Sequence, residues 1–157
     1  MKQSEIIQLS RAISILDGKG SDRLKWAIYR TSEKIQKAST DAMKFIEEMK
    51  PKNLKNLQKE QAEILQKCKT NQERQTAMLN WSKASDLENE LQKFTESDKY
   101  KNFIESNNEE FTPYPLTLEK EDLEGVELNN QTFFVLEKIG EGLDKVMEEI
   151  IKEEEKK

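Results

Sequence analysis

The sequence predicts an all-α protein: an elongated helical bundle with an N-terminal helical hairpin, one extended proline-containing arm and a C-terminal amphipathic helix. Charged residues make up 36% of the 157-residue chain and hydrophobic residues 34%, a balance typical of helices with solvated outer faces. Apolar residues recur at steps of three and four, and only five glycines and three prolines interrupt the chain. The length suits a single domain, residues 1–157.

The chain begins with a short predicted helix, residues 4–16, whose apolar face holds Ile6, Leu9, Ile13 and Leu16. The connection 17–20 contains Gly18 and Gly20, and glycine adopts positive φ without steric cost. The chain can therefore reverse here and start a second helix antiparallel to the first. This arrangement is a helical hairpin.

The second predicted helix is the longest in the chain and runs from about 21 to 49. Ser21 is an N-cap residue, Asp22 places a negative charge near the positive end of the helix dipole, and Pro51 prevents continuation past residue 50. Thr31 fills one gap in its apolar stripe. The stripe consists of Leu24, Ala27, Ile28, Ile35, Ala38, Ala42, Phe45, Ile46 and Met49.

A polar, lysine-rich segment after Pro51 keeps the apolar spacing of a helix, which predicts a third helix over 52–69. Thr70-Asn71 either ends this helix or lies within a longer one that reaches Trp81. Ser85-Asp86 then opens a further helical region that continues to Ile104.

The segment 111–118 has a different character. Pro113 and Pro115 exclude a helix, and apolar residues alternate with Pro115 and Thr117, so we expect an extended arm that lies across the helices. An acidic turn, 119–128, follows it. Leu123, Val126 and Leu128 are its expected anchors to the core.

The last predicted helix runs from about 130 to 155, with a solvated tail over 153–157. Its apolar residues alternate steps of three and four, the pattern of a heptad seam, which packs either within the domain or against a second subunit. Gly140 and Gly142 weaken its centre by about 1 kcal/mol each relative to alanine, and they allow either close helix contact or a kink. The seam consists of Leu136, Ile139, Leu143, Val146 and Ile150.

The long helix also carries a candidate binding surface away from its apolar stripe. A basic ridge lies about 110° from the middle of the stripe, and Trp26 and Tyr29 project beside it. Either other helices, or a second copy of the chain, cover the two aromatic rings, or the rings and cations form a surface for a nucleotide, a nucleic acid or an acidic partner. The ridge consists of Arg23, Arg30, Lys34, Lys37 and Lys44.

Charge is distributed unevenly along the chain. Residues 1–100 carry a net charge of +4 and residues 101–157 a net charge of −9, so the acidic C-terminal portion, 105–157, should attract the basic helices. That portion either folds back on the basic helices or faces a basic partner.

Catalysis is not expected. The chain has no histidine, which removes Ser-His-Asp and Cys-His nucleophile systems and histidine metal sites, and its adjacent carboxylate pairs diverge by about 100° on a helix. We therefore predict no cofactor, no metal and no catalytic residue. One cysteine, Cys68, no signal-peptide layout and no run of 18 apolar residues favour a soluble, cytoplasmic protein with no membrane association.

In layout the chain resembles small helical proteins encoded by phages and prophages of low-GC bacteria. The resemblance covers most of the chain but uses no specific motif. It lies in the short opening helix that ends in Leu16-Asp17-Gly18, the 23–28 start of a long helix, a polar helical middle and an acidic 118–128 turn before a last amphipathic helix. Lysine outnumbers arginine 22 to 4, consistent with an AT-rich genome. The known proteins of this kind include virion assembly factors and inhibitors of host defence that act by binding.

The sequence thus favours a non-enzymatic accessory protein that binds a protein partner or assembles with itself, such as an inhibitor of a host defence system. Trp26, Tyr29 and the heptad seam are the expected surfaces. The alternative is a module that sequesters a nucleotide or nucleic acid on Arg23, Arg30, Lys34 and Lys37, whose binding would weaken steeply with salt.

Overall fold

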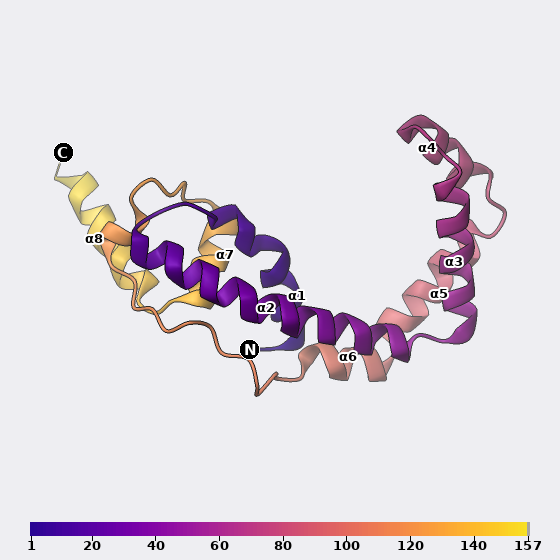
Figure 1. Ribbon diagram of the computed structural model, residues 1–157, viewed down its shortest axis with the longest axis horizontal. Helices are drawn as coiled ribbons and strands as arrows, with labels where there is room; N and C mark the ends of the chain where they lie inside the picture. Colours follow the sequence, from indigo (N-terminus) through magenta and orange to yellow (C-terminus); the bar gives the residue numbers. More distant parts are fainter. Residues whose placement is uncertain (157) are drawn as a thin grey trace. The chain divides into compact units, whose positions relative to one another are not determined.

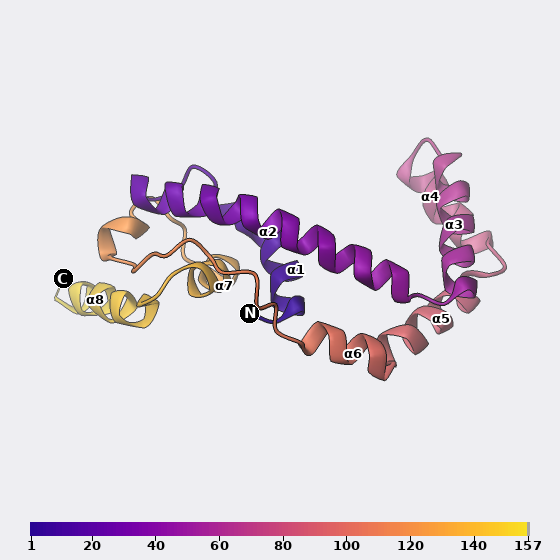
Figure 2. The ribbon, with the colours of Figure 1, turned by 60° about the horizontal axis from the view of Figure 1, so that its bottom comes forward.

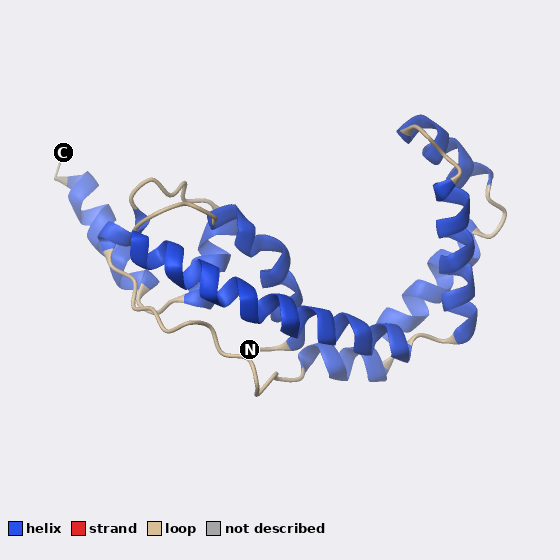
Figure 3. Ribbon diagram, in the orientation of Figure 1, coloured by secondary structure: helices blue, strands red, loops and turns tan. Residues whose placement is uncertain are grey.

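The computed structural model describes residues 1–156, and in that part of the chain the regular secondary structure is all helical, with no strand (Figures 1 and 3). The predicted all-α class is confirmed. Within residues 1–156, no helix is long and apolar enough to cross a membrane. The elements are α1 (Gln3–Ala12), the 3-10 helix η1 (Ile13–Leu16), α2 (Asp22–Met49), α3 (Lys52–Gln66), α4 (Asn71–Asn80), α5 (Ala84–Glu96), α6 (Asp98–Glu105), the 3-10 helix η2 (Lys120–Leu123), α7 (Asn130–Ile139) and α8 (Leu143–Glu155).

The contacts divide the chain into two compact units. Unit 1 comprises residues 1–43 and 105–156, and unit 2 comprises residues 44–104. The sequence predicts one domain, and that stays a prediction.

Unit 1 begins with the expected helical hairpin. Gly18 and Gly20 have φ of 68° and 80°, the left-handed conformations that the turn requires. Ser21 caps α2, because its Oγ accepts a hydrogen bond from the Leu24 amide at 3.1 Å. The first helix packs on the second where Ser10 Oγ donates to Ser39 Oγ at 2.9 Å.

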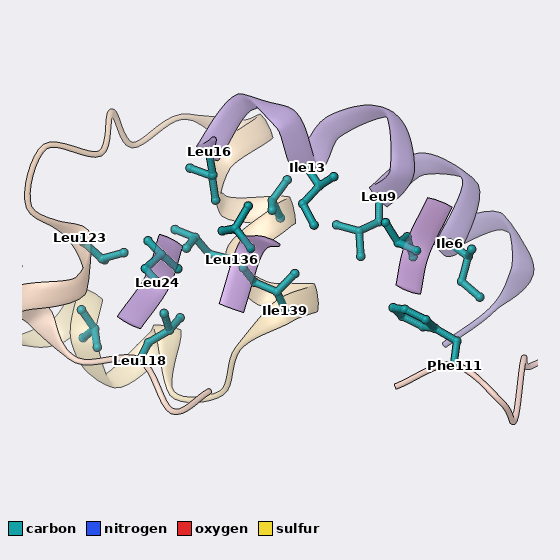
Figure 4. Close-up of a cluster of buried hydrophobic side chains, with 14 residues drawn as sticks. Ile6, Leu9, Ile13, Leu16, Leu24, Phe111, Leu118, Leu123, Leu136 and Ile139 are labelled. Atoms are coloured by element: carbon teal, nitrogen blue, oxygen red, sulfur yellow. The ribbon is translucent and has the colours of Figure 1, made fainter. Parts of the chain in front are cut away.

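The hydrophobic core of unit 1 draws on almost all of its elements. Figure 4 shows side chains from α1, α2, α7, η2 and the 111–118 arm pointing into one interior. Its members are Ile6, Leu9, Ile13, Leu16, Leu24, Ile28, Ile35, Phe111, Leu118, Leu123, Val135, Leu136, Ile139 and Val146.

The 111–118 arm is extended, as predicted, and lies beside α2 (Figure 2). The Tyr114 amide donates to Thr31 Oγ1 at 3.0 Å, and Thr31 is fully buried. This bond explains the polar gap in the apolar stripe of α2, since the half-buried Tyr114 amide needs an acceptor where the arm meets the helix.

The last helix differs from the prediction. The sequence predicts one helix over 130–155, whereas the structure has two, α7 and α8, with Gly140–Gly142 between them. Gly142 has a φ of 84°, and a Cβ on Gly140 would lie 2.9 Å from Leu118 Cγ. The arm occupies the break: Glu141 N donates to Leu116 O at 2.9 Å and Leu118 N to Glu141 O at 2.8 Å. The prediction of one continuous helix over 130–155 is therefore wrong, and the chain breaks at the two glycines.

Unit 2 consists of the end of α2, α3, α4, α5 and most of α6. Of the two arrangements predicted around Thr70-Asn71, the structure shows a break: α3 ends at Gln66, and Thr70 caps α4 by accepting from the Glu73 amide at 3.1 Å. Glu60 on α3 accepts from Trp81 Nε1 at 3.4 Å and pairs with Lys83 Nζ at 3.0 Å, joining α3 to the start of α5. Only four residues between 44 and 104 are buried: Ile46, Leu54, Leu87 and Phe94.

Candidate binding surface on the long helix

Trp26 and Tyr29 lie on α2 within unit 1, away from its apolar stripe as the helix spacing predicts, and the described helices of the same chain do not bury them. Trp26 is 52% exposed and Tyr29 56% exposed. Residues three apart are neighbours on a helix surface, and the two rings stack with centroids 5.7 Å apart and planes 28° apart. Two large aromatic rings are therefore held together in solvent.

Arg30, one turn after Trp26, completes this group. Its Cζ lies 5.7 Å from the centroid of the Trp26 ring, within the range of a cation–π contact. The guanidinium also pairs with Glu33, with Nη1 to Oε2 at 3.5 Å. We call Trp26, Tyr29 and Arg30 the aromatic patch. Because its members already contact one another, a partner would immobilise few additional rotamers on binding.

A groove of about 400 Å³ lies next to Tyr29, between α2 and the η1 turn. Ile13 and Ile28, both buried, contribute apolar lining, while Asp17 and Lys25 contribute one charge of each sign. The sequence carries no signal for this groove, since η1 and α2 approach each other only in the folded hairpin. A groove of mixed polarity beside exposed rings can take a side chain of a bound partner.

Arg23 does not belong to a continuous basic surface. Its Nη2 donates to Thr117 O at 2.9 Å, and the guanidinium lies 3.3 Å from a Glu119 carboxylate oxygen and 3.9 Å from Asp122 Oδ2. The acidic turn thus folds back on the start of the basic helix, one of the two outcomes that the charge distribution predicts. Arg23 anchors that turn and is neutralised by it.

Asp122 could not be singled out from the sequence, because it is one acidic residue in an acidic run. Asp122 is only 2% exposed. Its carboxylate accepts from Ser21 Oγ at 2.5 Å and from the Glu119 amide at 2.8 Å. These bonds fix η2 to the N-terminus of α2, so the buried carboxylate has a structural role.

Lys34 and Lys37 lie further along α2 and line a separate hollow of about 280 Å³ with the 108–112 segment. Asp41 and Glu110 line the same hollow. The two lysines therefore share their surroundings with two carboxylates, and the predicted ridge is electrostatically mixed along its length in unit 1.

The heptad residues are placed inside unit 1. Leu136, Ile139 and Val146 are buried in its core, and Leu143 and Ile150 pack against that core half-buried. Of the two arrangements considered for the seam, the structure shows packing within the unit.

Among residues 1–156, no group of three or more histidine, cysteine, aspartate or glutamate side chains is arranged to hold a metal ion. Comparison of the chain with known protein families, with curated proteins and with solved structures found no match.

Proposed function

We propose that this protein is a non-enzymatic accessory protein, of the kind that phages and prophages encode, and that it acts by binding a protein partner through the aromatic patch. The observation that carries the proposal is the pair of stacked, half-exposed rings of Trp26 and Tyr29 under Arg30. Trp, Tyr and Arg are the residues most enriched among those that dominate protein–protein binding energies. If the partner is a host enzyme, the protein would inhibit that enzyme by covering part of its surface, as a defence inhibitor does.

The local charges favour a protein partner over a nucleic acid. Nucleic-acid binding depends on several cations that neutralise phosphates. Here Arg30 is paired with Glu33, Arg23 with Glu119 and Asp122, and Lys34 and Lys37 share a hollow with Asp41 and Glu110. A mixed-charge rim around apolar rings is instead typical of protein interfaces.

The test is quantitative affinity capture from lysate of a candidate host, followed by titration of purified captured protein against variants. Replacing both rings, Trp26→Ala with Tyr29→Ala, should weaken binding by roughly 100-fold or more, since each such residue contributes about 2 kcal/mol. Met43→Ala is the matched control, because Met43 is a 43% exposed apolar residue on the same helix. It should bind like the wild type.

The same preparations should be titrated against a fluorescent single-stranded oligonucleotide and against ATP at low and moderate salt. The proposal fails if the double ring variant binds its partner as tightly as wild type. It also fails if the oligonucleotide binds, weakens steeply with salt and is lost on Lys34→Glu with Lys37→Glu.

A further inference from the structure

Helix α8 is attached to unit 1 by fewer buried side chains than α7, the helix before it. Val146 is the one residue of α8 that is buried, with Leu143 and Ile150 half-buried against the core, whereas α7 buries four residues. Most of the stability of a helix in a protein comes from the packing of its apolar face. Helix α8 is therefore suited to opening locally while the rest of unit 1 stays folded.

The residues just before α8 determine where such a movement occurs. Glu141 is held by the extended arm: its amide donates to Leu116 O at 2.9 Å, and its carbonyl accepts from the Leu118 amide at 2.8 Å. Gly142 follows with φ of 84°, and a Cβ placed on it would lie no closer than 3.8 Å to its nearest neighbour. The chain is thus fixed up to residue 141, and Gly142 has both the room and the backbone freedom of a hinge.

The acidic turn is the part of unit 1 on which α8 rests, with η2 as the main helical neighbour of α8 (Figures 1 and 2). Both elements of this contact are acidic. The turn, residues 119–128, carries five carboxylates and one cation, and α8 carries six carboxylates and two cations, so each has a net charge of −4. Two packed elements of like charge repel one another.

Lys120 is the one cation of the acidic turn, and it connects the two acidic elements. Its Nζ donates a hydrogen bond to Glu153 in the last turn of α8 and forms an ion pair with that carboxylate. The hydrogen bond to Glu153 is the main cause that raises the pKa of Lys120 above its ordinary value. The charges of Glu121 and Glu149 raise this pKa further. Carboxylates of the turn and of α8 thus surround one ammonium group, and without its charge they would face only one another.

We propose that α8 is a lid hinged at Gly142, and that Lys120 is the electrostatic latch that holds it closed on the acidic turn. With the lysine charge in place, attraction to the carboxylates of α8 offsets the repulsion between helix and turn. When that charge is removed, α8 rotates away and exposes its apolar side, which carries Leu143, Val146 and Ile150. The aromatic patch lies on α2 and takes no part in this movement.

Alkylation of a buried thiol measures the opening. In a Cys68→Ala background, Val146→Cys places a thiol on the buried side of α8. Val135→Cys is the matched control, because it places a thiol at a fully buried valine of α7. Iodoacetamide reacts with either thiol only while that thiol is exposed. Val146→Cys should react at least about tenfold faster than Val135→Cys, because α8 opens alone whereas α7 is exposed only when the core unfolds.

The latch is tested by changing the charge of Lys120. Lys120→Met keeps the aliphatic stem and removes the charge, so it should raise the alkylation rate of Val146→Cys by roughly threefold to tenfold and leave that of Val135→Cys unchanged. Lys120→Arg retains the charge and should keep the rate of the parent. Lys145→Met is the control for net charge, since it removes one cation from an exposed position of α8, and it should also keep that rate.

High salt separates charge repulsion from lost packing. At about 1 M sodium chloride the Debye length is about 3 Å, so the Lys120→Met rate should return toward that of the parent. Circular dichroism verifies that each variant is folded. Equal alkylation rates of Val146→Cys and Val135→Cys would overturn the lid. An unchanged rate in Lys120→Met, the same acceleration in Lys120→Arg or Lys145→Met, or an acceleration that salt does not reduce would overturn the latch.

Discussion

The two units of the chain use helices in different ways. Unit 1 contains all 14 residues of the hydrophobic core cluster, contributed by elements from both ends of the sequence, and all five glycines. Unit 2 contains four buried residues and no glycine, and its helices follow one another along the chain. The difference shows that the number of helices does not determine how much core they enclose.

What closes the core of unit 1 is the set of turns between its helices. Gly20 has φ of 80° and packs against Asp122 O, where no side chain fits, and Gly142 allows α8 to start in a new direction beside the arm. In unit 2 the connections are short and the helices lie alongside their neighbours. Helix α3 packs against α5 and α4 in turn, and most apolar residues of unit 2 remain half-buried.

The largest expected contrast comes from the same substitution in the two units. Leu136→Ala in unit 1 removes a fully buried side chain and should lower the free energy of unfolding by about 4 kcal/mol. Leu91→Ala in unit 2 removes a half-buried one and should cost about 1 kcal/mol. Urea denaturation monitored by circular dichroism measures both.

Hydrogen exchange resolved by peptide then locates each effect. Leu136→Ala should accelerate exchange across 1–43 and 105–156, and Leu91→Ala only within 44–104. Equal costs for the two variants, or acceleration spread evenly over the chain by either, would show that the two units share one cooperative core.

The next contrast lies inside a single turn of unit 1. Gly18 and Gly20 both have positive φ, but a Cβ on Gly18 meets nothing within 4 Å, whereas one on Gly20 would contact Asp122 O and lie 2.5 Å from Leu24 Cδ2. Gly18→Ala should cost about 1 kcal/mol from backbone strain alone, and Gly20→Ala about 3 kcal/mol.

Thermal unfolding of both variants tests this difference, and Gly18→Ala serves as the control for φ. If both variants unfold at the same temperature, the contact between Gly20 and Asp122 does not hold the acidic turn on α2.

The parts of the fold that are determined by residues close together in sequence were predictable. Periodicity located α2, and Ser21 and Pro51 set its ends. Two prolines predicted the extended arm, and Gly18 and Gly20 predicted the hairpin turn. Each of these signals acts over a few residues, so no knowledge of the tertiary structure was needed.

The features that depend on distant residues were not predictable. The heptad spacing of Leu136, Ile139 and Leu143 continues across Gly140–Gly142, although the helix does not, because the break accommodates Leu118 and the arm. For the candidate site, helical spacing placed Trp26 and Tyr29 away from the apolar stripe but left open whether other helices cover the two rings. It could not show that Arg23 is bound by residues 117–122, nearly 100 positions later in the chain.

The smallest expected effect concerns pH and lies in unit 2. Hydrogen bonds from Lys83 and then from Trp81 Nε1 lower the pKa of Glu60 below its ordinary value. A lowered pKa in the folded state adds stability above the pKa of the unfolded chain, and that stability is lost as pH falls through the folded value. The stability of unit 2 should therefore decrease slightly when the pH falls below the ordinary pKa of glutamate.

Trp81 provides the readout, because its indole donates to the same carboxylate. In a Trp26→Phe background, Trp81 fluorescence should change in acid. Glu60→Gln keeps a hydrogen-bond acceptor for Trp81 but cannot titrate, so it should remove the pH dependence while lowering stability at neutral pH only slightly. Glu63→Gln is the matched control, one turn further along α3, and should keep the wild-type titration. An unchanged acid transition in Glu60→Gln would mean that the join between α3 and α5 does not depend on this ion pair, and that apolar packing alone holds unit 2 together.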